Sequence, residues 1–166
     1  SQIFSAKAGP GYRLVTAGYF NNDALLDLIW TSSANDLIML IGNGSTFTDS
    51  KIGNYPDAGR IFGSGDVNGD GRDDLLLQNK ALNTWGYWIM DGARVVTSSG
   101  FSAGVGYYPV SVADFNGDDR IDVMWSSAAA DLQLLSSNGS SFVHSYVGSY
   151  GTNSGWRPID TGVTTN

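Results

Sequence analysis

The chain of 166 residues contains no cysteine, no glutamate and only one histidine, His144. Without cysteine it has no disulfides, thiol nucleophiles or thiolate metal sites. The cysteine content therefore does not indicate whether the protein belongs to an oxidising or a reducing compartment. One histidine is too few for a typical histidine-based zinc centre. No apolar run approaches the roughly 18 residues that a membrane-spanning helix requires. We therefore expect neither thiol chemistry nor insertion into a membrane.

Positive charge is also scarce. Nine lysines and arginines stand against sixteen acidic residues, which gives a net charge of −7. Such a surface repels phosphate backbones, so a nucleic-acid partner is not expected. The first residues, Ser1–Phe4, do not form a signal peptide, so for an exported protein we expect that signal to have been removed or to lie outside this sequence.

The residues that are abundant favour strands and turns. All sixteen acidic residues are aspartate, and they accompany 22 glycines and many Ser, Thr and Asn residues. Helices favour Glu, Lys, Ala and Gln, whereas Asp, Asn, Gly and Ser favour tight turns. The composition therefore predicts an all-β fold.

The sequence contains three similar units. Residues 12–34, 60–80 and 108–128 align with one another, and Tyr19, Asp66 and Asp114 take equivalent positions, 47 and 48 residues apart. The later part of each unit recurs as DLIMLIGNG, TWGYWIMDG and DLQLLSSNG. Because fixed-period self-similarity marks repeat architectures, we interpret the chain as a repeat protein.

Each unit contains four short apolar segments. An Asn-Gly or Asp-Gly pair separates the third segment from the fourth, which predicts a β-hairpin. Several segments are apolar at consecutive positions, which indicates burial on both faces of a sheet. Four-stranded sheets that recur every 40–50 residues or so are typical of β-propeller blades. We predict such blades over approximately 11–58, 59–106 and 107–154.

Both ends of the sequence look like parts of further blades. Residues 1–10 resemble a fourth strand, and residues 155–166 resemble a first strand. Three blades do not close a ring, for which roughly four to eight are usual. Unpaired end strands also invite pairing with another chain. We therefore expect either a homo-oligomer that completes the ring or a larger propeller of which this sequence is a part.

Two acidic windows carry a pattern of metal ligands. Loop 2 (residues 66–74) and loop 3 (residues 114–122) place oxygen side chains at relative positions 1, 3, 5 and 9, and position 7 can offer its backbone carbonyl. Calcium prefers about six to eight oxygen ligands, and alternate residues of a tightly wound loop converge on one point. We predict about two calcium ions per chain. The predicted ligands are Asp66, Asn68, Asp70, Arg72 (carbonyl) and Asp74, and then Asp114, Asn116, Asp118, Arg120 (carbonyl) and Asp122.

Two observations bear on this prediction. A turn rich in Asp, Asn and Gly can also form without any metal, and such solvated turns are common. Loop 1 (residues 19–27) serves as an internal comparison, because Tyr19 replaces the first ligand and Ala24 replaces a turn glycine. We expect loop 1 to keep its shape and to bind calcium weakly or not at all. Magnesium is disfavoured because it demands a strict octahedron and retains its waters.

The span from the first to the ninth position, with a strand before and after it, resembles the FG-GAP or VCBS repeat family. These repeats form the calcium-loop blades of integrin α-subunit heads and of many exported bacterial proteins. The resemblance covers nearly the whole chain as three units. It implies a secreted or cell-surface protein in which calcium is structural and lies on the outer part of a blade.

A narrower segment, residues 148–157, is similar to the linkers of propeller lectins, which bind sugars such as N-acetylglucosamine or fucose between blades. This likeness rests on Gly155, Trp156 and Arg157. Aromatic faces stack on the C–H face of a pyranose, and polar side chains bind its hydroxyls. The candidate ligand-binding residues are Trp156, Arg157, Tyr107, Tyr108, Trp85 and Tyr87, although the repeat alignment of Trp85 with leucines also favours a core position.

No motif supports catalysis. His144 lies in a fourth-strand segment without a nucleophile elbow, and paired carboxylates occur only in the predicted calcium loops. We therefore expect a non-catalytic module that binds calcium and recognises extracellular glycans or cell-surface polymers. The alternatives are a protein-interaction or structural module of a larger secreted adhesin, and an accessory module of a carbohydrate-active enzyme.

Overall fold

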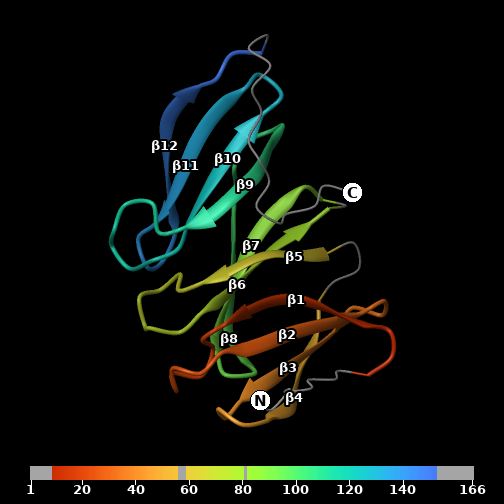
Figure 1. Cartoon of the computed structure of the whole chain (residues 1–166). Coiled ribbons are helices and arrows are strands. Elements are labelled where there is room, and N and C mark those ends of the chain that lie inside the picture. The colour runs from red at the N-terminus through yellow and green to blue at the C-terminus, as the bar shows by residue number, and fades with distance from the viewer. Residues whose placement is uncertain (1–8, 56–58, 81, 153–166) are drawn as a thin grey trace.

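The computed structural model describes residues 9–55, 59–80 and 82–152, and all the regular structure in these residues is β-strand. Twelve strands form three antiparallel sheets of four strands each, and within each sheet the strand order follows the chain. Figure 1 shows the sheets following one another as successive layers. This arrangement confirms the predicted all-β fold of propeller blades. Among the described residues, none belongs to a helix that could span a bilayer.

The three sheets are called blades 1, 2 and 3. Blade 1 consists of β1 (Tyr12–Gly18), β2 (Asp27–Ser32), β3 (Asp36–Gly42) and β4 (Phe47–Asn54). Blade 2 consists of β5 (Gly59–Gly65), β6 (Asp74–Asn79), β7 (Thr84–Asp91) and β8 (Arg94–Phe101). Blade 3 consists of β9 (Tyr107–Ala113), β10 (Asp122–Ser127), β11 (Asp131–Ser137) and β12 (Phe142–Ser149).

The Asn-Gly and Asp-Gly pairs form the predicted hairpins between the third and fourth strands. Gly44, Gly92 and Gly139 adopt φ angles of 81°, 58° and 88°, which glycine accommodates without a steric penalty. In blade 1 the Asn43 side chain accepts hydrogen bonds from the backbone N–H groups of Ser45 and Thr46, at 3.0 and 2.7 Å. The turn chemistry therefore sets the register of the third and fourth strands.

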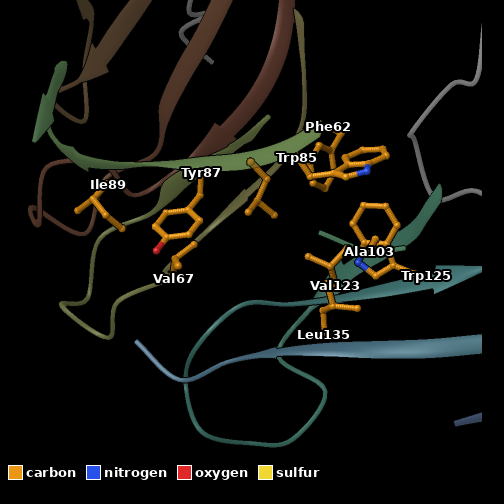
Figure 2. Close-up of a cluster of buried hydrophobic side chains, with 10 residues drawn as sticks. Phe62, Val67, Trp85, Tyr87, Ile89, Ala103, Val123, Trp125 and Leu135 are labelled. Carbon is orange, nitrogen blue, oxygen red and sulfur yellow. The ribbon is translucent and has the colours of Figure 1, made fainter. Parts of the chain in front are cut away.

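The blades stack face to face and bury two apolar clusters. Blades 1 and 2 enclose Phe20, Ile29, Leu37, Met39, Tyr55, Leu75, Leu77 and Met90. Blades 2 and 3, with the linker between them, enclose Phe62, Val67, Leu76, Trp85, Tyr87, Ile89, Ala103, Val123, Trp125 and Leu135, most of which Figure 2 labels. Blade 2 is therefore covered on both faces, and this explains why Leu75, Leu76 and Leu77 are all buried along β6.

The first strands of the blades are the main points of strand contact between sheets, because β1 contacts β5 and β5 contacts β9 (Figure 1). The three blades in the described part of the chain do not close a ring. Apolar side chains remain exposed on the outer blades, including Leu26 of loop 1 and Phe115 of loop 3.

Candidate metal-binding loops

The three loops occupy equivalent places in their blades, each between the first and the second strand. In loops 2 and 3 the carboxylate at position 1 turns into the loop and accepts backbone N–H groups. Asp66 Oδ1 lies 2.6 Å from the nitrogen of Gly69, and Asp66 Oδ2 lies 2.7 Å from that of Gly71. Asp114 makes the equivalent bonds with Gly117 and Asp119, at 2.7 and 2.9 Å. The first predicted ligand therefore lies at the centre of each loop.

These hydrogen bonds affect the acidity of Asp114. Desolvation acts to raise the pKa of this carboxyl, but the surrounding N–H groups outweigh it and lower the pKa below its ordinary value. The loop backbone therefore favours the charged carboxylate, which is the form that binds a cation.

The side chains at positions 3 and 5 contact each other in both loops. Asn68 Nδ2 donates to Asp70 Oδ2 at 3.0 Å, and Asn116 Nδ2 donates to Asp118 Oδ2 at 3.3 Å. The residue at position 7 adds an arginine side chain near the same carboxylate. Arg72 Nη2 lies 2.7 Å from Asp70 Oδ2, whereas Arg120 Nε lies 4.0 Å from Asp118 Oδ2. A cation bound in loop 2 would therefore compete with Arg72 for Asp70, and the competition is weaker in loop 3.

The aspartate at position 9 has a structural role in every blade. Asp74 is fully buried, and its two oxygens accept the N–H groups of Val67 at 2.9 Å and Met90 at 2.8 Å. Asp122 bonds Phe115 and Ser137 in the same way, at 3.1 and 3.0 Å. The carboxylate therefore connects the start of the loop to the end of the third strand, including in blade 1, where Asp27 accepts from Phe20 and Gly42.

Burial raises the pKa of these position-9 carboxyls. For Asp74 desolvation is the largest cause, and it raises the pKa to about 6 although the N–H groups of Met90 and Val67 lower it. Asp70 and Asp66 contribute further, because their negative charges disfavour another charge nearby. The same order of causes raises the pKa of Asp122, where the neighbouring charges are Asp118 and Asp114.

The calcium ligands stay a prediction. In loop 2 the side chains at positions 3 and 5 contact each other, the position-1 carboxylate accepts backbone N–H groups of the loop, and the charges at positions 1 and 5 help to raise the pKa of position 9. However, no group of three His, Cys, Asp or Glu side chains in the described residues is arranged to hold a metal ion. Both oxygens of the position-9 carboxylate Asp74 already accept backbone hydrogen bonds. A carboxylate oxygen has two lone pairs, so it can accept an N–H and also bind a cation.

Loop 1 adopts the same conformation with fewer acidic side chains. Asn22 and Ala24 have φ angles of 62° and 60°, in the places of Gly69 and Gly71 with 80° and 81°. Its third and fifth positions, Asn21 and Asp23, keep the mutual hydrogen bond at 2.9 Å. At position 1, Tyr19 supplies no carboxylate. The conformation of the loop therefore does not depend on the first acidic residue.

The loops also connect neighbouring blades. The position-8 residue of each later blade donates its N–H to the position-1 carbonyl of the preceding blade: Asp73 to Tyr19 at 2.9 Å, and Ile121 to Asp66 at 2.7 Å. The side chain of this position-8 residue lies against the glycine that ends the first strand of the preceding blade. At Gly65 a Cβ would lie 2.6 Å from the side chain of Ile121, so only glycine fits there. Sequence reasoning missed this role of position 8, although the signal was present as a glycine before loops 1 and 2.

The structure distributes the predicted ligand-binding residues over different environments. Trp85 and Tyr87 are each only 5% exposed and belong to the core between blades 2 and 3 (Figure 2). Neither ring therefore presents a free face to a sugar, and we drop both from the predicted set. Tyr108 is 37% exposed at the start of β9, and the Tyr107 hydroxyl contacts Asp131 at 3.4 Å. Trp156 and Arg157 lie outside the described residues.

His144 shows no catalytic arrangement. Its Nδ1 lies 3.5 Å from Gln133 Oε1 on the surface of blade 3.

A family model described as an FG-GAP-like repeat matches residues 19–77 and again 66–125. Together the two matches cover more than half of the chain. The chain belongs to the FG-GAP-like repeat family. This confirms the resemblance found in the sequence. Each match begins at position 1 of a loop and ends in the second strand of the next blade, so each FG-GAP-like repeat spans one contact between blades. No curated protein and no solved structure gives a significant match.

Membership in the FG-GAP-like family places the chain among propeller-type interaction or structural modules. Such modules are typically non-catalytic.

Proposed function

We propose that this chain is a non-catalytic, calcium-stabilised propeller module that recognises carbohydrate at the cell surface or outside the cell. The observation that carries the calcium assignment is the common geometry of loops 2 and 3, in which the position-1 carboxylate turns into the loop backbone and the side chains at positions 3 and 5 contact each other. Millimolar extracellular calcium would keep sites of moderate affinity filled.

The charge of the loops supports the same proposal. Loops 2 and 3 together hold eight of the sixteen aspartates, and each loop contains one arginine. Like charges this close repel one another, and burial of Asp74 adds to the cost of ionising that carboxyl. A divalent cation would reverse both effects, and its binding to the folded state alone would stabilise the module by mass action.

Isothermal titration of the chelator-treated protein with calcium is expected to give a stoichiometry near two. Asp70→Ala and Asp118→Ala should each remove one site, because each deletes the position-5 carboxylate of one loop. The matched control is Asp23→Ala in loop 1, which should leave the stoichiometry unchanged.

Calcium should also raise the melting temperature of the wild-type chain. An absence of heat together with an unchanged melting temperature would contradict the calcium assignment, and an unaltered stoichiometry in Asp70→Ala would contradict the role of loop 2.

The carbohydrate assignment rests on the aromatic residues that link the blades. Tyr107 and Tyr108 begin β9, where one ring is partly exposed and the other contacts Asp131. We expect the wild-type chain to bind members of a glycan array with micromolar or better affinity, and loss of that binding in Trp156→Ala would assign it to the linker aromatics. A blank array over broad chemistries would instead favour a protein-interaction or structural role.

The second candidate function, a structural or protein-interaction module, has its own supporting observation. Leu25, Leu26 and Phe47 surround an apolar cavity of about 210 Å³ on blade 1. At the two contacts between blades, the position-8 residue equivalent to Leu26 packs against a neighbouring blade. Another blade, from a second copy or from the remainder of a larger propeller, would cover the exposed leucines. An adhesin or an accessory module of a carbohydrate-active enzyme would fit this arrangement.

A further inference from the structure

Blade 2 has a hollow at the end of the sheet opposite its acidic loop. The hollow has a volume of about 300 Å³ and is lined by the end of β6, the start of β7 and the end of β8. Its lining includes Leu77 and Trp88 of the apolar cluster between blades 1 and 2, and also Trp85 and Tyr87 of the cluster between blades 2 and 3. Leu77 and its cross-strand partners Gly86 and Gly100 lie on the face toward blade 1, because side chains alternate between the two faces of a sheet. This volume is at the lower end of the range of about 300–1,000 Å³ that is usual for small-molecule sites.

The cause of the hollow is a single row of paired residues across the sheet. In blade 2 Leu77 pairs with Gly86, and Gly86 pairs with Gly100. The equivalent row in blade 1 is Trp30, Ile38 and Lys51, and in blade 3 it is Trp125, Gln133 and Tyr146. Gly86 and Gly100 therefore stand where the other two blades have large side chains, and Leu77 stands where they have tryptophan. Blade 2 alone among the three has this row nearly empty.

The rows on either side form the walls. On one side lie Trp88 and its partner Ser98, and on the other lie Asn79 and its partner Thr84. Trp88 takes the place of Leu40 in blade 1 and Leu135 in blade 3, since each pairs with the residue directly after the position-9 aspartate. An aromatic wall is therefore present only in the blade whose next row is empty.

The lining indicates the class of ligand. Trp88 offers an aromatic surface, and the hydroxyls of Ser98 and Thr84 can each donate and accept a hydrogen bond. No charged side chain lines the hollow among the described residues, and the net charge of −7 disfavours anionic ligands. A pyranose matches this lining, because its C–H face stacks on an aromatic ring and its edge carries neutral hydroxyls.

We infer that the hollow of blade 2 is a binding site for a single neutral sugar ring, which stacks on Trp88 above the Gly86–Gly100 pair. This inference rests on the proposed recognition of carbohydrate and specifies a location distinct from the linker aromatics. Gly86 also has a structural reason to be glycine, since a Cβ there would lie 2.7 Å from the carbonyl oxygen of Ser99. Gly100 is exposed, and a Cβ there would approach the Trp85 carbonyl only to 3.4 Å.

The test is saturation-transfer difference NMR on the full chain in calcium, with glucose, galactose, mannose, fucose and N-acetylglucosamine added separately and sialic acid as the anionic comparison. Gly100→Tyr introduces the residue found at the equivalent place in blade 3 and should weaken binding of the neutral sugars at least tenfold. Trp88→Leu introduces the residue of the other two blades and should have a similar effect. Thr97→Tyr is the control, because it adds the same side chain to the opposite face of β8.

A second measurement locates the sugar directly. Of the five tryptophan indole N–H signals in a nitrogen-15 spectrum, the signal that is absent from Trp88→Leu should be the one that moves when sugar is added. Sugar binding that persists unchanged in both Gly100→Tyr and Trp88→Leu would overturn the hollow as the site and leave the proposed carbohydrate recognition intact. Failure of the wild-type chain to bind any of the sugars would overturn both.

Discussion

Replacing Trp125 with alanine is expected to lower the free energy of unfolding by about 3–5 kcal/mol, the usual cost of deleting a large aromatic side chain from a core. Trp125 is fully buried between blades 2 and 3. Its ring packs edge-on against Trp85 at 4.3 Å and against Phe62 and Phe101, each at 6.2 Å between centroids. The substitution therefore removes contacts that hold two blades together as well as contacts within blade 3. Urea denaturation followed by circular dichroism measures the change.

The matched control is Trp30→Ala, which removes the same side chain from the same position in blade 1. Trp30 pairs with Ile38 as Trp125 pairs with Gln133, but it is only half-buried. Because less apolar area is lost at Trp30, its substitution should cost clearly less than that of Trp125. Equal losses for the two variants would contradict the view that packing between blades provides most of the stability at Trp125.

Replacing Asp74 with alanine should destabilise the chain by about 2–4 kcal/mol in buffer that contains a chelator. The substitution leaves the N–H groups of Val67 and Met90 buried without their acceptor, and each such group costs about 1–3 kcal/mol. Part of this loss is offset, because the buried carboxylate itself is costly to desolvate. The shift in the midpoint of urea denaturation measures the net effect, and the chelator removes any contribution from calcium.

Asp70→Ala separates the structural role from metal binding. Asp70 lies on the loop surface and pairs with Arg72, so its loss should change the calcium-free stability by less than about 1 kcal/mol. It should nevertheless abolish the stabilisation that calcium adds to loop 2. If Asp74→Ala unfolds at the same urea concentration as the wild type in chelator, the hydrogen bonds by which Asp74 connects loop 2 to β7 contribute nothing to the free energy of unfolding.

Three kinds of contact hold the FG-GAP-like repeats of this chain together. Apolar clusters join the faces of neighbouring blades, and a buried carboxylate joins each acidic loop to its own blade. Direct hydrogen bonds from the Asp73 and Ile121 nitrogens then join each loop to the preceding one. Calcium, where it binds, would act on loops whose conformation the hydrogen bonds already define.

Several features followed from local sequence alone. The Asn-Gly and Asp-Gly pairs predicted the hairpins, because these residues tolerate the positive φ angles that tight turns require. The spacing of Asn68 and Asp70 predicted that their side chains meet, because alternate residues of a tight loop face one point. Both are short-range effects that involve residues close together in the chain.

Only the tertiary structure decided which aromatic residues are accessible and what each aspartate does. Trp85 and Trp88 are three residues apart on β7 and therefore face opposite sides of the sheet. Blade 3 packs over Trp85 and buries it, whereas Trp88 lies beside the hollow that Gly86 and Gly100 leave in blade 2. Asp70 and Asp74 belong to the same acidic loop, yet only Asp74 faces the interior, where it accepts hydrogen bonds from the backbone N–H groups of Val67 and Met90. Local sequence specifies the strands and turns, whereas burial depends on residues from other blades, about 50 positions away along the chain.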